Sequence, residues 1–520
     1  MEYSGIFVIY ILLVLNSIVH CSPANILFAM TGPNSHYECG VRVAQVLKSR
    51  GHNITFLVPK FESESPAVTK RADVFNFEYT SEKKTDSLDV GINIYERLNN
   101  ANLIGKFKIG LEILDLVSRW WRNELEKFIS DPLLMDRISD AAYDLIIVEG
   151  NFVWLLPFAQ RHHSYFVIMT TYSLNSVNLE WFNLPTELSY IPFDNSVNQF
   201  TYDFRKGRLS FFERLINLVQ LFQKFHIHTL LGQEMFTIQK EYHVATDWWG
   251  HDSFGRAEIW LTNSNFATDY PRPFFPNMGL VGGLTVEASK LLNNDFESIM
   301  AAAGDAGVII VSMGTVIKSR SQNLVNSMAE AFAKLPQTVI WKATEPLPET
   351  VGENTLLRKW IPQNDLLGHP NTRAMVYHCG NNGAFEALYH GVPIIAVPVF
   401  ADQTDVAYRI MSNGMGVVVE TTTLTNESMF RAVSEVINNP KYKNRAMELS
   451  AIYRDYDTPV EMAAFWIEYV LRHRGARLLK SKAADMSFVK EYLLDVFAIF
   501  LVIGLLVVIT TKHCFSTLLK

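Results

Sequence analysis

Three features are scarce or missing in this sequence, and each excludes a class of protein. The 520 residues include only four cysteines, too few for a disulfide framework or a cysteine-based metal site. The net charge of −7 argues against a nucleic-acid partner. No G-x-G-x-x-G follows the first apolar strand segment, which disfavours a dinucleotide-dependent oxidoreductase.

Apolar segments stand at both ends of the chain. Residues 6–19 have the length of the apolar core of a secretory signal peptide, although no Lys or Arg precedes them. Residues 493–511 are long enough to cross a bilayer once. Together they predict a single-pass type I membrane protein, whose body lies in the lumen of the endoplasmic reticulum or outside the cell. Sequons at Asn53 and Asn426 fit glycosylation of that lumenal body.

Between these ends, apolar segments of strand length alternate with segments of helical character. This alternation predicts parallel α/β sheets, because parallel strands need a crossover connection between them. The pattern stops at a proline-rich stretch, residues 258–287, and then begins again, so two domains facing a cleft are expected. The predicted division is a signal peptide (1–22), an N-terminal domain (23–285), a C-terminal domain (286–475), a juxtamembrane segment (476–492), a transmembrane helix (493–511) and a cytosolic tail (512–520).

The stretch from Trp360 to Gln403 carries the strongest functional signal. It has the pattern of a strand, a polar turn, a helix and a second strand, and in parallel sheets ligands bind beyond the carboxyl ends of the strands. The turn from Gly380 to Gly383 precedes the predicted helix at 384–390, so its N–H groups and the helix dipole favour a diphosphate. The neighbouring candidates for binding that diphosphate are His378, Asn382, Ser312, Gly314 and Thr315.

Other side chains of this stretch match the remaining parts of a nucleotide sugar. The carboxylate of Glu386 can accept hydrogen bonds from both hydroxyls of a ribose. Trp360 offers a flat face for base stacking. Asp402 and Gln403 are expected at the next strand end, where they can hold sugar hydroxyls. Each residue alone is also compatible with core packing or a solvated helix, but one residue for each ligand part favours a nucleotide-sugar site. The arrangement requires no metal.

These residues form a pattern that resembles the UDP-glycosyltransferase family, in its membrane-bound animal type. The matching positions are Trp360-x-Pro362-Gln363, His378-x-Gly380-x-Asn382-Gly383-x-x-Glu386, His390-Gly391-Val392-Pro393 and Asp402-Gln403. The two apolar ends and the short basic tail also resemble that family. The run from Gln363 to Pro370 is similar to the arthropod branch.

The resemblance implies a GT-B fold, with two Rossmann-like domains facing a cleft. The acceptor would bind in the N-terminal domain and the UDP-sugar in the C-terminal domain. By the same resemblance Trp360 stacks on uracil, Gln363 helps to hold the nucleoside, and His36 is the catalytic base. In the family, an aspartate at the end of the strand that matches residues 143–148 orients this base. Here Glu149 stands at that strand end, and we predict that it replaces the aspartate.

The expected activity is inverting, metal-independent transfer of a hexose to a hydroxyl of a small lipophilic acceptor, as in detoxification. The UDP-sugar is a co-substrate, so no cofactor is expected. Glucose is the expected sugar, and glucuronate is the alternative. A catalytically impaired member that binds UDP-sugar or a lipophile without efficient transfer is the alternative function, since the aspartate is missing. Association into a homo-oligomer is left open.

Overall fold

The computed structural model describes most of the predicted C-terminal domain and about half of the predicted N-terminal domain. The described residues are 21–30, 34–60, 66–80, 131–150, 165–173, 209–219, 255–314, 322–343, 347–399, 402–482, 486–491 and 493–518, with a few further positions between 105 and 241. Thr315 and nearly all of the predicted signal peptide lie outside these residues.

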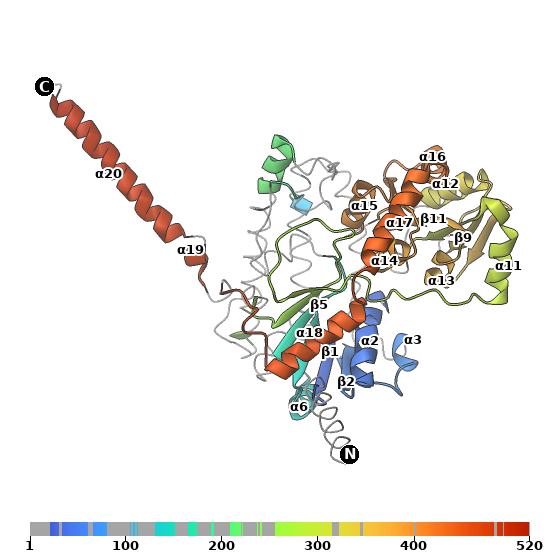
Figure 1. Cartoon of the computed structure of the whole chain (residues 1–520), viewed down its shortest axis with the longest axis horizontal. Helices are drawn as coiled ribbons and strands as arrows, with labels where there is room; N and C mark the ends of the chain where they lie inside the picture. The colour runs from blue at the N-terminus through green and yellow to red at the C-terminus, as the bar shows by residue number, and fades with distance from the viewer. Residues whose placement is uncertain are drawn as a thin grey trace, which may run out of the picture.

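The N-terminal half forms a seven-stranded sheet in which the paired strands are parallel (Figure 1). The strand order is β3-β2-β1-β4-β5-β6-β7. The strands are β1 (Asn25–Ala29), β2 (Asn53–Pro59), β3 (Asn76–Thr80), β4 (Leu145–Glu149), β5 (Tyr165–Thr170), β6 (Ile259–Thr262) and β7 (Met278–Leu280). The helices of this half include α2 (Asn34–Ser49), α3 (Pro66–Thr69) and α6 (Pro132–Asp140). Strand β4 is buried along its whole length, as expected for a central strand of a covered parallel sheet.

The C-terminal half forms a second parallel sheet of six strands, in the order β10-β9-β8-β11-β12-β13. The strands are β8 (Val308–Ser312), β9 (Thr338–Lys342), β10 (Thr355–Arg358), β11 (Thr372–Tyr377), β12 (Ile394–Ala396) and β13 (Gly416–Val418). The helices around it are α11 (Asn294–Ala302), η3 (Gly304–Ala306), α12 (Gln322–Ala333), α13 (Gln363–Leu367), α14 (Asn381–Tyr389), α15 (Gln403–Ser412), α16 (Asn426–Asn438) and α17 (Pro440–Arg454).

Both faces of the second sheet are covered by helices. Val308 and Ile310 of β8 pack in the core under α13, α14 and α17. Ile309 and Val311, which point to the other face, pack in the core under α12 and α16. Because successive side chains of a strand point to opposite faces, an unbroken apolar strand requires this cover on both sides.

Near its end the chain returns to the first sheet. Helix α18 (Pro459–His473), which lies within the range expected for the C-terminal domain (286–475), packs beside α2 (Figure 1). Its residues Ala463, Ile467 and Val470 are buried in the core of the N-terminal half. This helix therefore fastens the second half of the chain to the first.

The described chain ends in two further helices, α19 (Phe488–Glu491) and α20 (Leu494–Leu518). Helix α20 is apolar, 25 residues long, and exposed throughout its length. By length and composition it is a candidate membrane span. Figure 1 shows it extending away from the two sheets.

Two helices begin earlier than expected from the sequence. Helix α2 begins at Asn34, so His36 lies in its first turn and not in the preceding loop. Helix α14 begins at Asn381, so Asn382 and Gly383 are helical and do not form a separate turn. The first turn of a helix exposes unpaired N–H groups and favours polar residues, so apolar periodicity does not mark where these helices start.

Candidate active site

Four neighbouring strands of the first sheet bring the predicted catalytic residues together. Strand β4 lies between β1 and β5, and β6 follows β5. All four are parallel, so their carboxyl ends share one edge of the sheet. At this edge His36 follows β1, Glu149 ends β4, Thr171 follows β5 and Asn263 follows β6.

The imidazole of His36 is held through its Nδ1 atom. The hydroxyl of Thr171 lies 2.9 Å from this nitrogen and donates a hydrogen bond of 3.1 Å to Oε1 of Glu149. The direct distance from Nδ1 to Oε1 is 3.4 Å. The side chain of Glu149 is fully buried, whereas that of His36 is 26% exposed. The structure therefore places Glu149 beside His36, with an edge of the imidazole accessible.

The charges around His36 favour the role of a base that the sequence predicts for it. Burial lowers the pKa of His36, but the nearby carboxylate of Glu149 and the charge of Asp402 outweigh burial, so the pKa lies above 6.5. Burial also raises the pKa of Asp402, and His36 opposes that change. Because Asp402 belongs to the second domain, the two predicted functional groups interact across the domain interface. A raised pKa strengthens the imidazole as a proton acceptor.

The facing edge of the second sheet carries the predicted diphosphate residues. Strand β8 ends at Ser312, and its neighbour β11 is followed by His378. The backbone carbonyl of Ser312 lies 3.4 Å from Nδ1 of His378. A Cβ atom on Gly314 or on Gly380 would lie 2.7 Å from Nε2 of the same ring, too close for any larger residue. These two glycines therefore make room for the imidazole.

The predicted nucleoside residues lie around α13 and α14. Trp360 is 66% exposed, so its indole is available for stacking and is not part of the core. The side chain of Gln363 donates a hydrogen bond of 2.6 Å to Glu386. Burial raises the pKa of Glu386 to about 7, although Gln363 and Lys342 act in the opposite direction. Glu386 therefore changes its charge near neutral pH.

Asn382 joins the two domains. Its side-chain nitrogen donates to the carbonyl of Ser35 at 3.2 Å. Its side-chain oxygen accepts from Cys39, at 3.5 Å, and from Asn263, at 3.2 Å. The adjacent Asn381 donates to the carbonyl of Asn263 at 2.8 Å. All of these hydrogen bonds of the Asn382 side chain are to residues of the N-terminal domain. Its role in binding the diphosphate stays a prediction.

Asp402 and Gln403 follow β12 along the chain and lie at the start of α15, with Asp402 at its N-cap position. Gln403 is buried, and its side-chain oxygen accepts a hydrogen bond of 3.0 Å from the backbone of Val399. This contact orients the start of α15. Asp402 is placed where it affects the pKa of His36, close to the expected reaction centre.

A buried cluster of ion-paired side chains around α15 acts on Asp402. Arg409 of α15 pairs with Asp269 and, at 2.8 Å, with Asp405. The positive charge of Arg409 also acts on Asp402. Since Asp269 precedes β7 of the first domain, the cluster is a second connection between the domains. Two acidic partners already balance the guanidinium.

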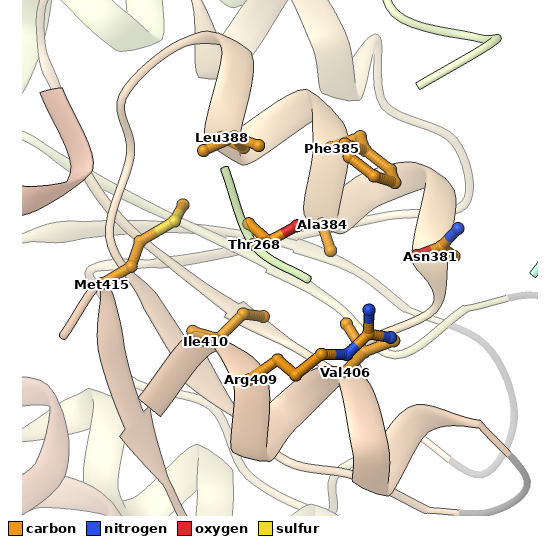
Figure 2. A pocket seen from close by; sticks show the side chains of 9 residues that line it. All are labelled: Thr268, Asn381, Ala384, Phe385, Leu388, Val406, Arg409, Ile410 and Met415. Atoms are coloured by element: carbon orange, nitrogen blue, oxygen red, sulfur yellow. The ribbon is translucent and has the colours of Figure 1, made fainter. Parts of the chain in front are cut away.

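Figure 2 shows a small cavity between α14 and α15. Its volume is about 20 Å³, enough for about one water molecule. Its lining residues are Thr268, Asn381, Ala384, Phe385, Leu388, Val406, Arg409, Ile410 and Met415. Trp360, His378 and His36 do not line it, so this cavity is a packing feature and not the expected ligand site.

Three residues near the site were not predicted from the sequence: Thr171, Asn263 and Lys342. Thr171 and Asn263 directly follow β5 and β6, and Lys342 ends β9. The same strand-end rule that selects His378 would have selected them. Within the described residues, Lys342 is linked electrostatically to Glu386, and burial lowers its pKa.

Two parallel α/β domains, with these residues at their facing edges, define the GT-B class of glycosyltransferases. The fold is similar to that of a UDP-glucosyltransferase from Polygonum tinctorium capable of glucosylating indoxyl, solved in complex with 3,4-dichloroaniline. The TM-score is 0.58 at 16% identity, and the match covers 87% of this chain and 99% of the other. At that identity the similarity concerns the fold alone.

The sequence comparisons identify the family. Residues 26–520 match the family described as UDP-glucoronosyl and UDP-glucosyl transferase. The chain is 32% identical to UDP-glucuronosyltransferase 2C1 of Oryctolagus cuniculus, over 91% of this chain and 94% of the relative. It is 30% identical to 2-hydroxyacylsphingosine 1-beta-galactosyltransferase of Mus musculus, over 89% and 82%. The chain belongs to the UDP-glycosyltransferase family, as its sequence motifs indicated.

Proposed function

We propose that this enzyme transfers glucose from UDP-glucose to a hydroxyl of a small lipophilic acceptor, with His36 as the base. Family membership gives UDP-dependent sugar transfer; the sugar, the stereochemistry and the acceptor class are the proposed parts. The observation that supports them most is that His36, backed by Thr171 and Glu149, lies opposite Asp402. The base and the donor-sugar subsite thus meet at one place between the domains.

The reaction needs a base because a neutral hydroxyl is a poor nucleophile at physiological pH. The acceptor oxygen forms a bond to the anomeric carbon while the bond from that carbon to the diphosphate oxygen breaks. The acceptor proton passes to Nε2 of His36, and the electron pair of the broken bond leaves with UDP. Since base and diphosphate are held by opposite domains, attack comes from the far face of the sugar and inverts the configuration.

The leaving diphosphate would be stabilised at the start of α14. The unpaired N–H groups of a helix N-terminus favour an anion, and His378 stands between Gly314 and Gly380 to donate a further hydrogen bond. We propose that these groups replace a divalent cation. Transfer should then continue in EDTA, whereas a metal-dependent enzyme would stop.

The charges near the sugar subsite favour a neutral hexose. The carboxylates of Asp402 and Glu149 both act on His36, so the local potential is negative. The guanidinium of Arg409 is already balanced by two acids, Asp269 and Asp405. A further carboxylate, as in glucuronate, would therefore be repelled. UDP-glucuronate is the second candidate, because the rabbit relative is named as a glucuronosyltransferase.

The decisive experiment compares radiolabelled UDP-glucose and UDP-glucuronate with a panel of phenols and aliphatic alcohols, using full-length protein in microsomes. We expect glucosides with inverted configuration and little or no glucuronide. A preference for glucuronate would overturn the charge argument. Binding of UDP without transfer to any acceptor would favour the catalytically impaired member, which the replacement of an aspartate by Glu149 suggests.

We further propose an endoplasmic reticulum location, with residues 1–22 removed, α20 spanning the membrane and a role in detoxification. Both sequon asparagines lie on the body that would be lumenal, Asn53 at the start of β2 and Asn426 at the start of α16. Glycosidase treatment should increase the gel mobility of the wild type. The double substitution Asn53→Gln and Asn426→Gln should remove that shift, whereas an unmodified wild type would contradict the lumenal orientation.

A further inference from the structure

The hydroxyl of Thr171 lies between the base and its carboxylate. Its distance is 2.9 Å to Nδ1 of His36 and 3.1 Å to Oε1 of Glu149. Both values are within the range of ordinary hydrogen bonds, whereas the direct distance of 3.4 Å between His36 and Glu149 is longer than that range. The shortest hydrogen-bonded path from the imidazole to the carboxylate therefore passes through Thr171.

We propose that Thr171 is a positioning residue through which Glu149 orients the catalytic base. Nδ1–H of His36 donates to the Thr171 hydroxyl, which in turn donates its own proton to Glu149. This chain fixes the proton on Nδ1, so that Nε2 keeps its lone pair and can accept the acceptor proton. When the imidazole becomes positively charged during transfer, Glu149 stabilises it through the same hydroxyl, and no proton needs to leave Thr171.

The surroundings of Thr171 hold its hydroxyl in place. The residue is 5% exposed, and its branched side chain has few rotamers available. Its backbone carbonyl accepts a hydrogen bond of 2.8 Å from Asn263, whose same nitrogen contacts Asn382 of the other domain at 3.2 Å. The position of the hydroxyl is thus fixed by the same domain interface that holds the start of α14.

The pairing of β4 with β5 brings the two residues of the relay together. Glu149 is buried at the end of β4 and pairs with Met169 of β5, two residues before Thr171. The register thus places the hydroxyl beside the carboxylate. The alternative is that the Thr171 hydroxyl merely satisfies its own buried hydrogen-bonding needs. The two interpretations differ in what removal of the hydroxyl does to catalysis.

The first test removes the hydroxyl while keeping the shape of the side chain. Thr171→Val should lower kcat by about 10- to 100-fold, within the range that general base catalysis supplies, and leave the KM for UDP-sugar nearly unchanged. The acid limb of the pH profile should move to lower pH, because the His36 imidazolium loses its link to the carboxylate. Thr171→Ser, which keeps the hydroxyl, should restore most of kcat.

The matched control is Thr170→Val. The hydroxyl of Thr170 is also buried, but it donates to the carbonyl of Tyr172 at 3.1 Å. This variant should retain kcat and the pH profile. Wild-type kinetics in Thr171→Val, or equal losses in Thr171→Ser and Thr171→Val, would overturn the relay and leave only packing. If Thr171→Val does not fold, as judged by UDP binding, Thr171→Ala takes its place.

The second test is a double-mutant cycle. In a relay, Glu149→Gln should cost much less in the Thr171→Val background than in the wild type, because the path is already broken. Multiplicative losses would show that the two side chains act independently and would overturn the inference. The inference rests on the proposed role of His36, so His36→Ala is measured alongside. Retained transfer in His36→Ala would defeat the base assignment itself, whereas lost transfer with a normal Thr171→Val would defeat only the relay.

Discussion

The side chain of Asn382 donates a hydrogen bond of 3.2 Å to the backbone carbonyl of Ser35, the residue directly before His36. Asn382 lies in the first turn of α14, and Ser35 lies in the first turn of α2. The helix that would hold the diphosphate thus contacts the helix that carries the base. On the proposed function each domain would contribute one reacting partner, and this contact links the two helices that would hold them.

Replacing Asn382 by alanine should impair catalysis more than donor binding. The variant loses its bonds to Ser35, Cys39 and Asn263, so His36 is less well placed, and stability should fall by about 1–2 kcal/mol. We expect a lower kcat, a lower Tm and little change in the Kd for UDP measured by calorimetry. If the Kd increases in parallel with the loss of kcat, Asn382 binds the diphosphate directly.

Trp360 should contribute to nucleotide affinity through stacking. Its indole is largely exposed, so truncation leaves the core intact and removes a stacking energy of about 1–3 kcal/mol. Trp360→Ala should therefore weaken UDP binding by about 5- to 150-fold. Trp360→Phe, which keeps a flat face, should recover much of the affinity. An unchanged Kd in Trp360→Ala would show that uracil binds elsewhere.

The sequence predicted the alternation of strands and helices, because apolar strand segments and proline-rich breaks are local signals. The resemblance to the family also predicted that Glu149 would lie beside His36, because Glu149 stands where the family has the aspartate that orients the base. The bond between Thr171 and His36 was not predicted, because it joins residues 135 positions apart. Which hydroxyl reaches which nitrogen depends on strand order and rotamer, and the local sequence pattern contains neither.

Glu386 should make donor binding depend on pH. Burial raises its pKa to about 7, so the carboxyl is protonated below this pH and accepts hydrogen bonds from the ribose hydroxyls less well. The KM for UDP-sugar should thus increase as the pH falls from about 8 to about 6 and stay constant at higher pH. Glu386→Gln should have a KM that is higher and independent of pH. The same pH dependence in that variant would assign the titration to another group.

The rate should report the raised pKa of His36. Only the neutral imidazole can accept a proton, and Glu149 and Asp402 raise its pKa above 6.5. At saturating UDP-sugar, the activity should therefore decrease as the pH falls through the pKa of His36, which lies above 6.5. Glu149→Gln should lower kcat and move this limb to lower pH, since the imidazolium loses a carboxylate partner. A limb that stays in place in Glu149→Gln would mean that the carboxylate does not act on the base.

The central claim, that His36 removes the acceptor proton, is tested most directly by transfer and UDP binding measured together in His36→Ala. His369→Ala is the control, because His369 lies beside Glu297 and Asn371, outside the proposed reaction centre. We predict that His36→Ala loses at least about 100-fold in transfer, with the wild-type Kd for UDP, while His369→Ala remains active. Transfer by His36→Ala at a rate close to that of the wild type would contradict the account.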